Sequence, residues 1–278
     1  MIKKGKYFFR RYTCHLRILP DFLIVGAQKC GTSSLYRNLV RHPSIVPAFV
    51  KEVHFFDNSR NYFQKGVGWY KAHFPSLLYK YYITHICKND FITGEASPFY
   101  LFHPHALRRI SELLPEVKII VILRNPVDRA YSHYHHEVEK GRETLSFEDA
   151  VRMEEERLRG EFDKLMADEK YTSLNYSCYA YLLRGIYVDQ LKRVYSYFEK
   201  SQVLILKSED FFKDSQSTID KVFQFLGLPG WQMEHFKKAN VGSYQKMNSA
   251  TRNRLLNYFE PHNHKLYEYL GINFGWDK

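Results

Sequence analysis

A glycine-rich loop that follows a short apolar run contains the groups needed to bind a phosphate. The loop runs from Gly26 to Ser34 and directly follows the run Phe22 to Val25. A turn that leaves a buried strand and opens a helix directs backbone N–H groups and the positive end of the helix towards an anion. Lys29 adds a mobile positive charge, and the hydroxyls of residues 32–34 add donors. We therefore predict an anion site formed by Gly26, Gln28, Lys29, Cys30, Gly31, Thr32, Ser33 and Ser34.

The order of residues in this loop differs from that of the nucleoside-triphosphatase loop. In the pattern GxxxxGK[ST], the lysine follows the second glycine, and the next hydroxyl meets magnesium. Here Lys29 comes two residues before Gly31. The phosphate site is retained, but the arrangement that serves magnesium is not. A P-loop kinase that uses ATP and magnesium stays open as an alternative, and magnesium-dependent ATP consumption would support it.

A second candidate anion site follows a later apolar run. The segment Lys118 to Leu123 ends at Arg124, and Ser132 lies eight residues beyond that arginine. A nucleoside triphosphatase would commonly place a metal-binding aspartate at such a strand end. An arginine there, with a hydroxyl on the following helix, instead suits a phosphate bound by a fork of donors. Two anion sites without a metal carboxylate suggest a nucleotide with phosphates at both ends.

The elements that position these loops alternate between buried strands and amphipathic helices. The apolar runs Phe22 to Val25, Lys118 to Leu123 and Gln202 to Leu206 predict strands buried on both faces of a sheet. Helical spacing follows the first run over residues 32–40 and the second from about Val127. This alternation predicts an α/β fold, a single domain with a mainly parallel central sheet flanked by helices. Ligands of such sheets bind at the carboxyl ends of the strands, where both loops lie.

The 278 residues carry a net charge of +11, and six of the positive charges lie within the first 17 residues. We expect residues 1–19 to form a basic N-terminal extension and residues 20–278 to form the catalytic domain. A solubilising, partly disordered terminus is the favoured interpretation. Contact of this aromatic and basic segment with an anionic surface or with nucleic acid is the alternative. Loss of steeply salt-dependent nucleic-acid binding on deleting residues 1–17 would support that alternative.

The apolar runs and the cysteines indicate the cellular compartment in which the protein works. No apolar run approaches the ~18 residues of a membrane-spanning helix, and the N-terminus lacks the apolar stretch of a signal peptide. The four cysteines form no CxxC pair, which argues against structural zinc and favours a reducing compartment. His133 and Glu137 have metal-ligand spacing on a helix, but two ligands are too few, so no metal site is expected. We expect a cytoplasmic protein.

Several motifs in order resemble the PAPS-dependent sulfotransferases. The segments 22–43 (FLIVGAQKCGTSSLYRNLVRHP) and 121–134 (VILRNPVDRAYSHY) are similar to the two cofactor-binding signatures of that family. The element Lys51 to Asp57 (KEVHFFD) is similar to one found in the heparan-sulfate branch. The segments 94–98, 184–187, 240–248 and 254–276 also match in order. The resemblance covers roughly residues 20–276 and implies a P-loop nucleotide-kinase-like fold.

The resemblance also implies an activity and roles for individual residues. The donor would be 3′-phosphoadenosine 5′-phosphosulfate (PAPS), the product adenosine 3′,5′-bisphosphate (PAP), and no metal would be required. Lys29 would stabilise the leaving phosphate, Glu52 would be the general base, and His54 would help to position the acceptor. The remaining donor contacts would come from the first anion loop, from Arg124 and Ser132 at the 3′-phosphate, and from Tyr187, Gly242, Ser243 and Tyr244.

Departures from the family pattern bear on the acceptor. Ala96 stands where the heparan-sulfate branch usually has a lysine, and residues 240–242 lack the usual basic side chains. We therefore expect a hydroxyl or amine of a small-molecule, lipid or sugar acceptor, with a glycosaminoglycan-like polysaccharide as the alternative and no nucleic-acid partner. Some aromatic residues are expected to line the acceptor pocket, namely Phe55, Phe56, Phe99 and Tyr100. The acid-rich segment 137–165 is expected to be a solvated helical face, with a lid over the acceptor as the alternative.

Overall fold

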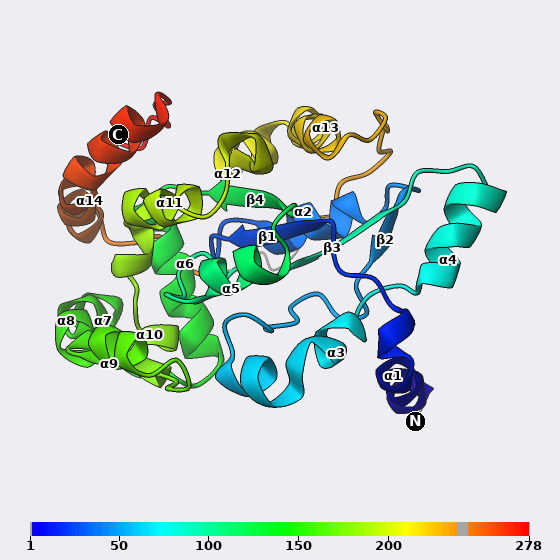
Figure 1. The fold of residues 1–278 in the computed structure, drawn as a ribbon. Helices are drawn as coiled ribbons and strands as arrows, with labels where there is room; N and C mark the ends of the chain where they lie inside the picture. The colour runs from blue at the N-terminus through cyan, green and yellow to red at the C-terminus, as the bar shows by residue number, and fades with distance from the viewer. Residues whose placement is uncertain (1, 238–243, 278) are drawn as a thin grey trace.

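The computed structural model describes residues 2–237 and 244–277 and contains a five-stranded parallel sheet (Figure 1). The strands are β1 (Phe22–Gly26), β2 (Ile45–Pro47), β3 (Ile92–Ala96), β4 (Lys118–Leu123) and β5 (Val203–Lys207). Their spatial order is β2-β3-β1-β4-β5, and every neighbouring pair is parallel. The predicted fold class is therefore confirmed. β1 and β4 lie side by side, with Phe22 opposite Lys118, so their carboxyl ends meet at one edge.

The sequence patterns locate three of the five strands. β1 and β4 match the predicted runs, and β5 is shifted by one residue. β2 and β3 are absent from the prediction. β3 was missed because it carries Thr93 and Glu95, polar residues that are nonetheless fully buried. An apolar run is the expected sign of a buried parallel strand, and this strand has none.

Helices cover both faces of the sheet (Figure 1). α2 (Thr32–Leu39) follows β1 and α6 (Pro126–Glu139) follows β4, as the sequence predicts. The other α-helices are α1 (Ile2–Tyr12), α3 (Gly66–Lys71), α4 (Leu77–Tyr81), α5 (Ala106–Leu113), α7 (Phe147–Arg152), α8 (Glu154–Leu158), α9 (Glu161–Ala167), α10 (Leu174–Cys178), α11 (Tyr187–Tyr195), α12 (Ser208–Lys213), α13 (Ser215–Leu226) and α14 (Ser249–Leu270).

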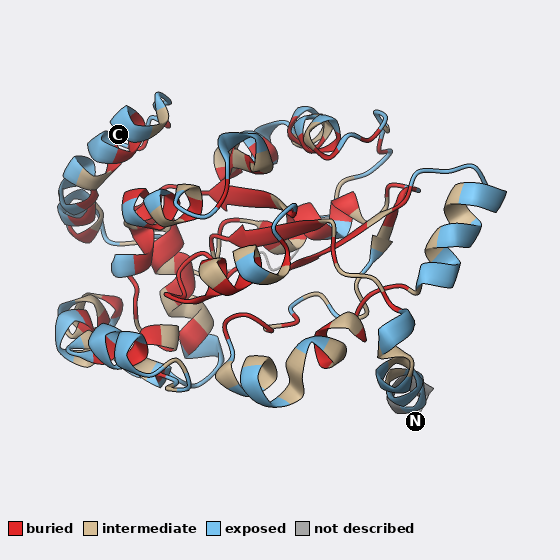
Figure 2. Ribbon diagram, in the orientation of Figure 1, coloured by how far each residue is buried: buried red, intermediate tan, exposed pale blue. Residues whose placement is uncertain are grey.

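The main core surrounds the sheet, and two smaller clusters attach the segment α7–α10 to it. Buried residues concentrate on the strands (Figure 2), where β1 is buried throughout. A second cluster packs α6 and α7 against α14 through Val127, Phe147 and Phe259. A third, with Phe102, Leu165 and Tyr176, joins α9 and α10 to the loop after β3. The segment α7–α10 is thus attached on one side to α6 and α14 and on the other to the loop after β3. Both attachments lie near the sheet edge that carries the two loops.

The N-terminal residues differ from the expected disordered extension. Residues 2–12 form helix α1, and Arg10 on this helix donates hydrogen bonds of 2.7 and 2.6 Å to the carbonyl oxygens of Ala72 and Phe74. Two guanidinium hydrogen bonds to main-chain acceptors fix the helix against the segment before α4. Throughout the described residues, no helix is long and apolar enough to cross a bilayer.

Candidate active site

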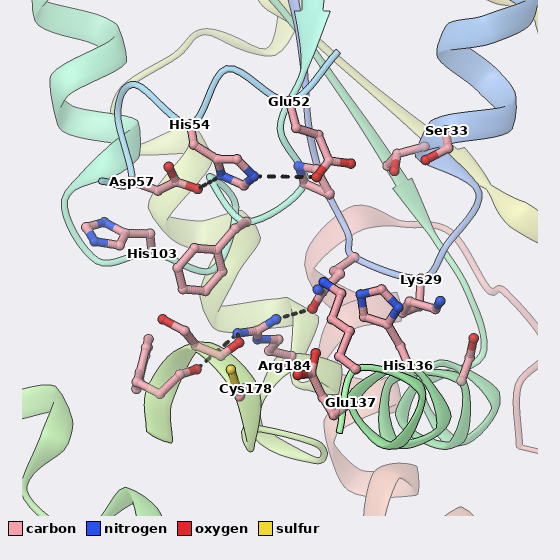
Figure 3. A pocket seen from close by; sticks show the side chains of 18 of the residues that line it. Lys29, Ser33, Glu52, His54, Asp57, His103, His136, Glu137, Cys178 and Arg184 are labelled. Carbon is pink, nitrogen blue, oxygen red and sulfur yellow. Dashed lines mark hydrogen bonds and ion pairs between the residues drawn. The ribbon is translucent and has the colours of Figure 1, made fainter. Parts of the chain in front are cut away.

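Both predicted anion loops open into one cavity of about 870 Å³. The cavity lies at the carboxyl ends of β1 and β4, where a parallel sheet binds its ligands. Figure 3 shows Lys29 and Ser33 on one side of it, Glu52 and His54 on a second, and Cys178 and Arg184 on a third. The residues from the first loop that line it are Gln28, Lys29, Gly31, Thr32 and Ser33.

The backbone of the first loop has left-handed conformations at two positions. Gly31 has φ +98° and is the residue before α2, and Lys29 has φ +69°. A side chain at Gly31 would be strained by that φ, and its Cβ would also come within 3.1 Å of Phe212. Burial lowers the pKa of Lys29, and the charge of Arg124 lowers it further, while Glu139 opposes the shift. Burial therefore disfavours the charge of Lys29, and an anion bound at this loop would favour it.

Three predicted members of the loop do not line the cavity. Gly26 contacts Leu101 so closely that an added Cβ would lie 2.5 Å from it. Cys30 and Ser34 are buried. The Cys30 Sγ lies 3.7 Å from the hydroxyl of Tyr187, and burial raises the pKa of this thiol to about 11. Cys30 is thus a neutral packing residue.

The second loop places Arg124 and Ser132 in the same cavity. An Nη1–H of Arg124 donates to the carbonyl oxygen of Lys29 over 3.4 Å, so the two loops touch. Tyr187 is buried and does not line the cavity, but its hydroxyl donates a 2.8 Å hydrogen bond to the carbonyl oxygen of Arg124. Asn125 caps α6 by accepting from the N–H of Val127 at 2.9 Å. These bonds fix the strand end that carries the arginine.

The late loop is only partly described. Tyr244 lines the cavity and stacks on His135 with ring centroids 4.2 Å apart and an interplanar angle of 6°. Gly242 and Ser243, predicted as donor contacts, lie outside the described residues. The stacked pair places an aromatic ring beside the second anion loop, since His135 belongs to α6.

Glu52, His54 and Asp57 form a hydrogen-bonded chain at the cavity wall (Figure 3). His54 Nδ1 lies 2.8 Å from Asp57 Oδ2, and His54 Nε2 lies 3.4 Å from Glu52 Oε2. Glu52 also pairs with Lys51. Burial alone would lower the pKa of His54, but the hydrogen bonds to Asp57 and Glu52 raise it to about 10. Burial alone would raise the pKa of Glu52, but His54 and Lys51 lower it to about 2. Glu52 is therefore ionised at neutral pH, and His54 is protonated.

A buried carboxyl positions the loop that carries Glu52. Glu95 accepts four hydrogen bonds: from the N–H of Val53 at 3.2 Å, from Ser97 and Tyr70 at 2.8 Å each, and from Tyr100 at 3.0 Å. Burial raises its pKa to about 7, although these donors oppose the shift. Because one acceptor satisfies four donors from three segments, Glu95 sets the distance between β3 and the 51–57 loop.

The acceptor side of the cavity contains aromatic rings and hydroxyl groups. Its lining includes Phe99, His103, Tyr171, Ser173, Tyr176 and Cys178. Of the four aromatic residues expected there, only Phe99 lines the cavity. The prediction is wrong for Phe55, Phe56 and Tyr100, which are fully buried in a stack beneath the 51–57 loop, where the Phe55 and Tyr70 centroids are 4.5 Å apart.

Arg184 links the first anion loop to the acceptor side, a role that the sequence did not reveal. Its guanidinium is buried, bonds to the side-chain oxygen of Gln28, and donates to the carbonyl oxygens of Ser177 at 2.6 Å and Tyr176 at 3.0 Å. The same group lies 4.6 Å from the Phe99 ring centroid. Burial lowers the pKa of Arg184 to about 10. The sequence feature that pointed to Arg184 was its position in the segment 184–187, which resembles the sulfotransferase family.

The segment 137–165 is not simply a solvated face. Among its acids, Glu137, Glu143, Glu154 and Glu161 are buried. Glu154 accepts from the N–H groups of Leu182 and Leu183 at 2.7 and 2.8 Å, and Glu143 binds Arg157 at 2.6 Å. The expected solvated face is therefore wrong for these four acids. Glu143, Glu154 and Glu161 accept hydrogen bonds, and Glu137 forms an ion pair with Arg142.

The helical His133 and Glu137 pair is packed inside the protein. Both side chains are buried, with Nε2 and Oε1 3.6 Å apart, and burial lowers the pKa of His133 well below its usual range. Glu137 instead binds Arg142 at 2.6 Å. Over the ranges that the structure describes, no group of three or more His, Cys, Asp or Glu side chains could hold a metal ion.

Comparison with known proteins agrees with this geometry. A family model described as "Sulfotransferase domain" matches residues 19–270. The chain is 32% identical to bifunctional heparan sulfate N-deacetylase/N-sulfotransferase 4 of Mus musculus, over 89% of this chain but only 29% of that protein. It is 29% identical to heparan sulfate glucosamine 3-O-sulfotransferase 6 of Homo sapiens, over 94% of this chain and 74% of that protein. Among solved structures, a sulfotransferase from Alicyclobacillus acidocaldarius is similar, with 31% identity, a TM-score of 0.71, and coverage of 94% of this chain and all of that one.

Proposed function

The chain belongs to the sulfotransferase family, whose members are PAPS-dependent enzymes, and from that premise we propose that it moves the sulfuryl group of PAPS to a hydroxyl or amine of a small-molecule, lipid or sugar acceptor. One observation carries the proposal: both anion loops and an ionised Glu52 line a single cavity. PAPS has a phosphosulfate at one end and a 3′-phosphate at the other, which is what two separate anion sites require.

We assign the donor contacts as follows. The N–H groups and hydroxyls of the loop residues that line the cavity, Gln28 to Lys29 and Gly31 to Ser33, bind the 5′-phosphosulfate. Arg124 with Ser132 binds the 3′-phosphate. The bond between the bridging oxygen and sulfur breaks, and that oxygen leaves with the electron pair as part of PAP. Lys29, which lies in the loop beside that phosphate, stabilises the developing charge. Sulfuryl transfer resembles phosphoryl transfer in that positioning and charge stabilisation supply most of the catalysis.

Glu52 takes the proton of the acceptor. As the acceptor oxygen or nitrogen bonds to sulfur, its proton becomes acidic, so even a carboxylate of low pKa can accept it. The protonated His54 sits between Glu52 and Asp57 and keeps the Glu52 carboxylate in one orientation. His54 is therefore a positioning residue for the Glu52 carboxylate.

Two guanidinium groups that line the cavity are already paired within the protein. Arg142 is bound to Glu137, and Arg184 is bound to Gln28 and to main-chain carbonyl oxygens. Neither guanidinium is therefore free to bind sulfate groups of an acceptor. Aromatic rings with neighbouring hydroxyls suit the apolar faces and hydroxyls of a sugar or small polyol. A glycosaminoglycan-like polysaccharide is the second candidate, since the relatives named above act on heparan sulfate.

Transfer of radioactive sulfate from PAPS tests the proposal. Acceptors would include a neutral glycoside, a glycolipid, an amino sugar and unsulfated heparosan, each with and without a chelator. We expect labelled product with at least one neutral acceptor and no effect of the chelator. PAPS that is neither bound nor consumed would contradict the proposal, and magnesium-dependent ATP consumption would favour the kinase alternative.

A cytoplasmic location stays a prediction, supported by four free cysteines.

A further inference from the structure

Helix α1 turns its aromatic side chains outward. Phe8, Phe9 and Tyr12 are 75%, 64% and 80% exposed. At 100° per residue these three positions share one face of the helix. The opposite face packs on the protein, with Tyr7 and Phe49 ring centroids 6.0 Å apart and the Arg10 guanidinium 5.1 Å from the Phe49 centroid. α1 therefore packs a half-buried tyrosine and a half-buried arginine against the protein and leaves Phe8, Phe9 and Tyr12 in water, the reverse of an ordinary surface helix.

Further exposed apolar side chains lie where residues 16–18 meet the start of α4. Arg17 and Ser76 form an antiparallel bridge, and Ile18 N donates to the carbonyl oxygen of Pro75 at 3.1 Å. Leu16 therefore stands across from Leu77, and these residues are 42% and 52% exposed. Leu78, 72% exposed, follows on α4. We call Phe8, Phe9, Tyr12, Leu16, Leu77 and Leu78 the α1–α4 surface; Figure 2 shows both helices largely exposed at one end of the molecule.

The exposed apolar area extends past α4. Tyr81, Tyr82 and Ile86, on α4 and the turn that continues it, are 57%, 52% and 62% exposed. Large apolar side chains that are exposed singly are normal, but a contiguous group of them marks an interaction site. Tyrosine adds a polar tip to an apolar body, which suits a boundary between water and an apolar phase.

Positive charge borders this surface. Lys6 and Arg11 flank the aromatic face of α1, and both are exposed. Arg10, Arg11 and Lys65 also surround His73, since burial and then these three charges lower the pKa of His73 to about 4. The acidic residue Asp21 lies near α4, where its Oδ1 is 4.0 Å from the Nζ of Lys80. An aromatic helix face bordered by lysine and arginine is the pattern of a helix that lies in the interface of an anionic bilayer.

We propose that the α1–α4 surface docks the enzyme on an anionic lipid bilayer, with Phe8, Phe9 and Tyr12 inserted at the level of the headgroups. The basic residues favour a bilayer over a second copy of the chain as the partner of this surface. Two copies facing each other would bring Lys6 and Arg11 of one copy against the same residues of the other, and these like charges would repel. A bilayer with anionic lipids instead supplies both the apolar layer and the opposite charge. The proposal concerns a surface away from the cavity lining, and it does not depend on the proposed function.

Vesicle co-sedimentation tests this docking directly. The full chain is mixed with phosphatidylcholine vesicles that contain or lack phosphatidylglycerol. We expect binding to the anionic vesicles, with a partition coefficient that falls as salt rises. Phe8→Ser with Phe9→Ser is expected to lower that coefficient by roughly tenfold or more. Lys6→Gln and Arg11→Gln are expected to lower it roughly fivefold each on anionic vesicles, and to have no effect on neutral ones.

A matched pair of exposed aromatic residues provides the control. Tyr258 and Tyr269 on α14 are 41% and 42% exposed, and their change to serine should leave vesicle binding unaltered. Unchanged melting temperatures and PAP affinities would show that the α1 variants remain folded. Absence of binding to anionic vesicles would overturn the proposal, as would binding that survives the double phenylalanine change. A dimer in sedimentation velocity that the same double change dissociates would also overturn it, by assigning the surface to a second copy.

Discussion

The donor half and the acceptor half of the cavity are built in different ways. The donor half consists of the Gly26–Ser34 loop and the Arg124 loop, which leave the adjacent strands β1 and β4. The acceptor half combines the 51–57 loop, the segment after β3 and the segment α7–α10, which are far apart in sequence. Its walls are joined by buried acids such as Glu95, Glu154 and Glu161. The donor half is therefore positioned by the backbone geometry of two loops at strand ends. The acceptor half is positioned by side-chain hydrogen bonds between segments far apart in sequence.

This difference predicts which kinetic and binding constants a substitution in each half should change. Changes in the donor half should alter nucleotide affinity or the chemical step for every acceptor. Changes in the buried acids should alter acceptor binding and stability while donor affinity is kept. Glu52 lies at the boundary, since it belongs to the acceptor half but acts on the reacting atoms.

Glu52→Gln should have the largest effect on turnover. The amide cannot take the acceptor proton, so we expect kcat to fall by ~10²–10⁴-fold. PAP affinity, measured by calorimetry, should change little, because the donor loops are untouched. Glu155→Gln, an exposed acid on α8, is the matched control. Full activity of Glu52→Gln would exclude Glu52 as the base.

Lys29→Asn should come next, with kcat lower by ~10²–10³-fold through loss of charge stabilisation at the leaving phosphate. Asparagine is chosen because it tolerates the positive φ of Lys29. Single-turnover transfer with saturating PAPS would isolate the chemical step. Lys140→Asn, another cavity lysine, controls for the general positive potential. Equal losses in the two variants would show that position within the loop does not matter.

The pH dependence should separate His54 from the donor half. The raised pKa of His54 means that its ion pairs are complete below about pH 6.5 and are lost as the pH rises through about 10. We expect kcat/KM to be flat around neutrality and to fall near pH 10. Asp57→Asn removes the 2.8 Å partner of His54 and should move this fall down by about 1 pH unit or more. An alkaline limb that Asp57→Asn leaves in place would mean that His54 does not control it.

Glu161→Gln should have the smallest effect. Glu161 accepts hydrogen bonds from Ser173 and from Tyr171 at 2.9 Å, and both donors line the acceptor side. We expect the acceptor KM to rise by roughly 2–10-fold, with the PAPS KM unchanged. Steady-state kinetics with each substrate varied in turn would measure the split. A matching rise in the PAPS KM would remove the distinction between the two halves.

How much the sequence could predict follows the same division. Lys29, Arg124 and Ser132 were identified because each sits at a fixed offset from an apolar strand, and strand ends of one parallel sheet converge. Asp57 and Arg184 were given no role, since nothing local indicates that Asp57 binds His54 or that Arg184 reaches Gln28. The sequence predicts a solvated face for the acids of residues 137–165, and this is wrong for the buried ones because burial by hydrogen bonding leaves no apolar pattern. Phe55 and Tyr100 were misplaced for a related reason, as composition does not reveal the face of a loop that packs inward.

The central claim is that one cavity binds a nucleotide with phosphates at both ends, and calorimetric binding of PAP and AMP tests it most directly. AMP lacks only the 3′-phosphate that Arg124 and Ser132 are assigned to bind. We predict that the enzyme prefers PAP by roughly 10–100-fold, as expected for charged hydrogen bonds, and that Arg124→Ala abolishes this preference with little change in AMP affinity. Equal affinities for the two nucleotides, or a preference that survives in Arg124→Ala, would contradict the account.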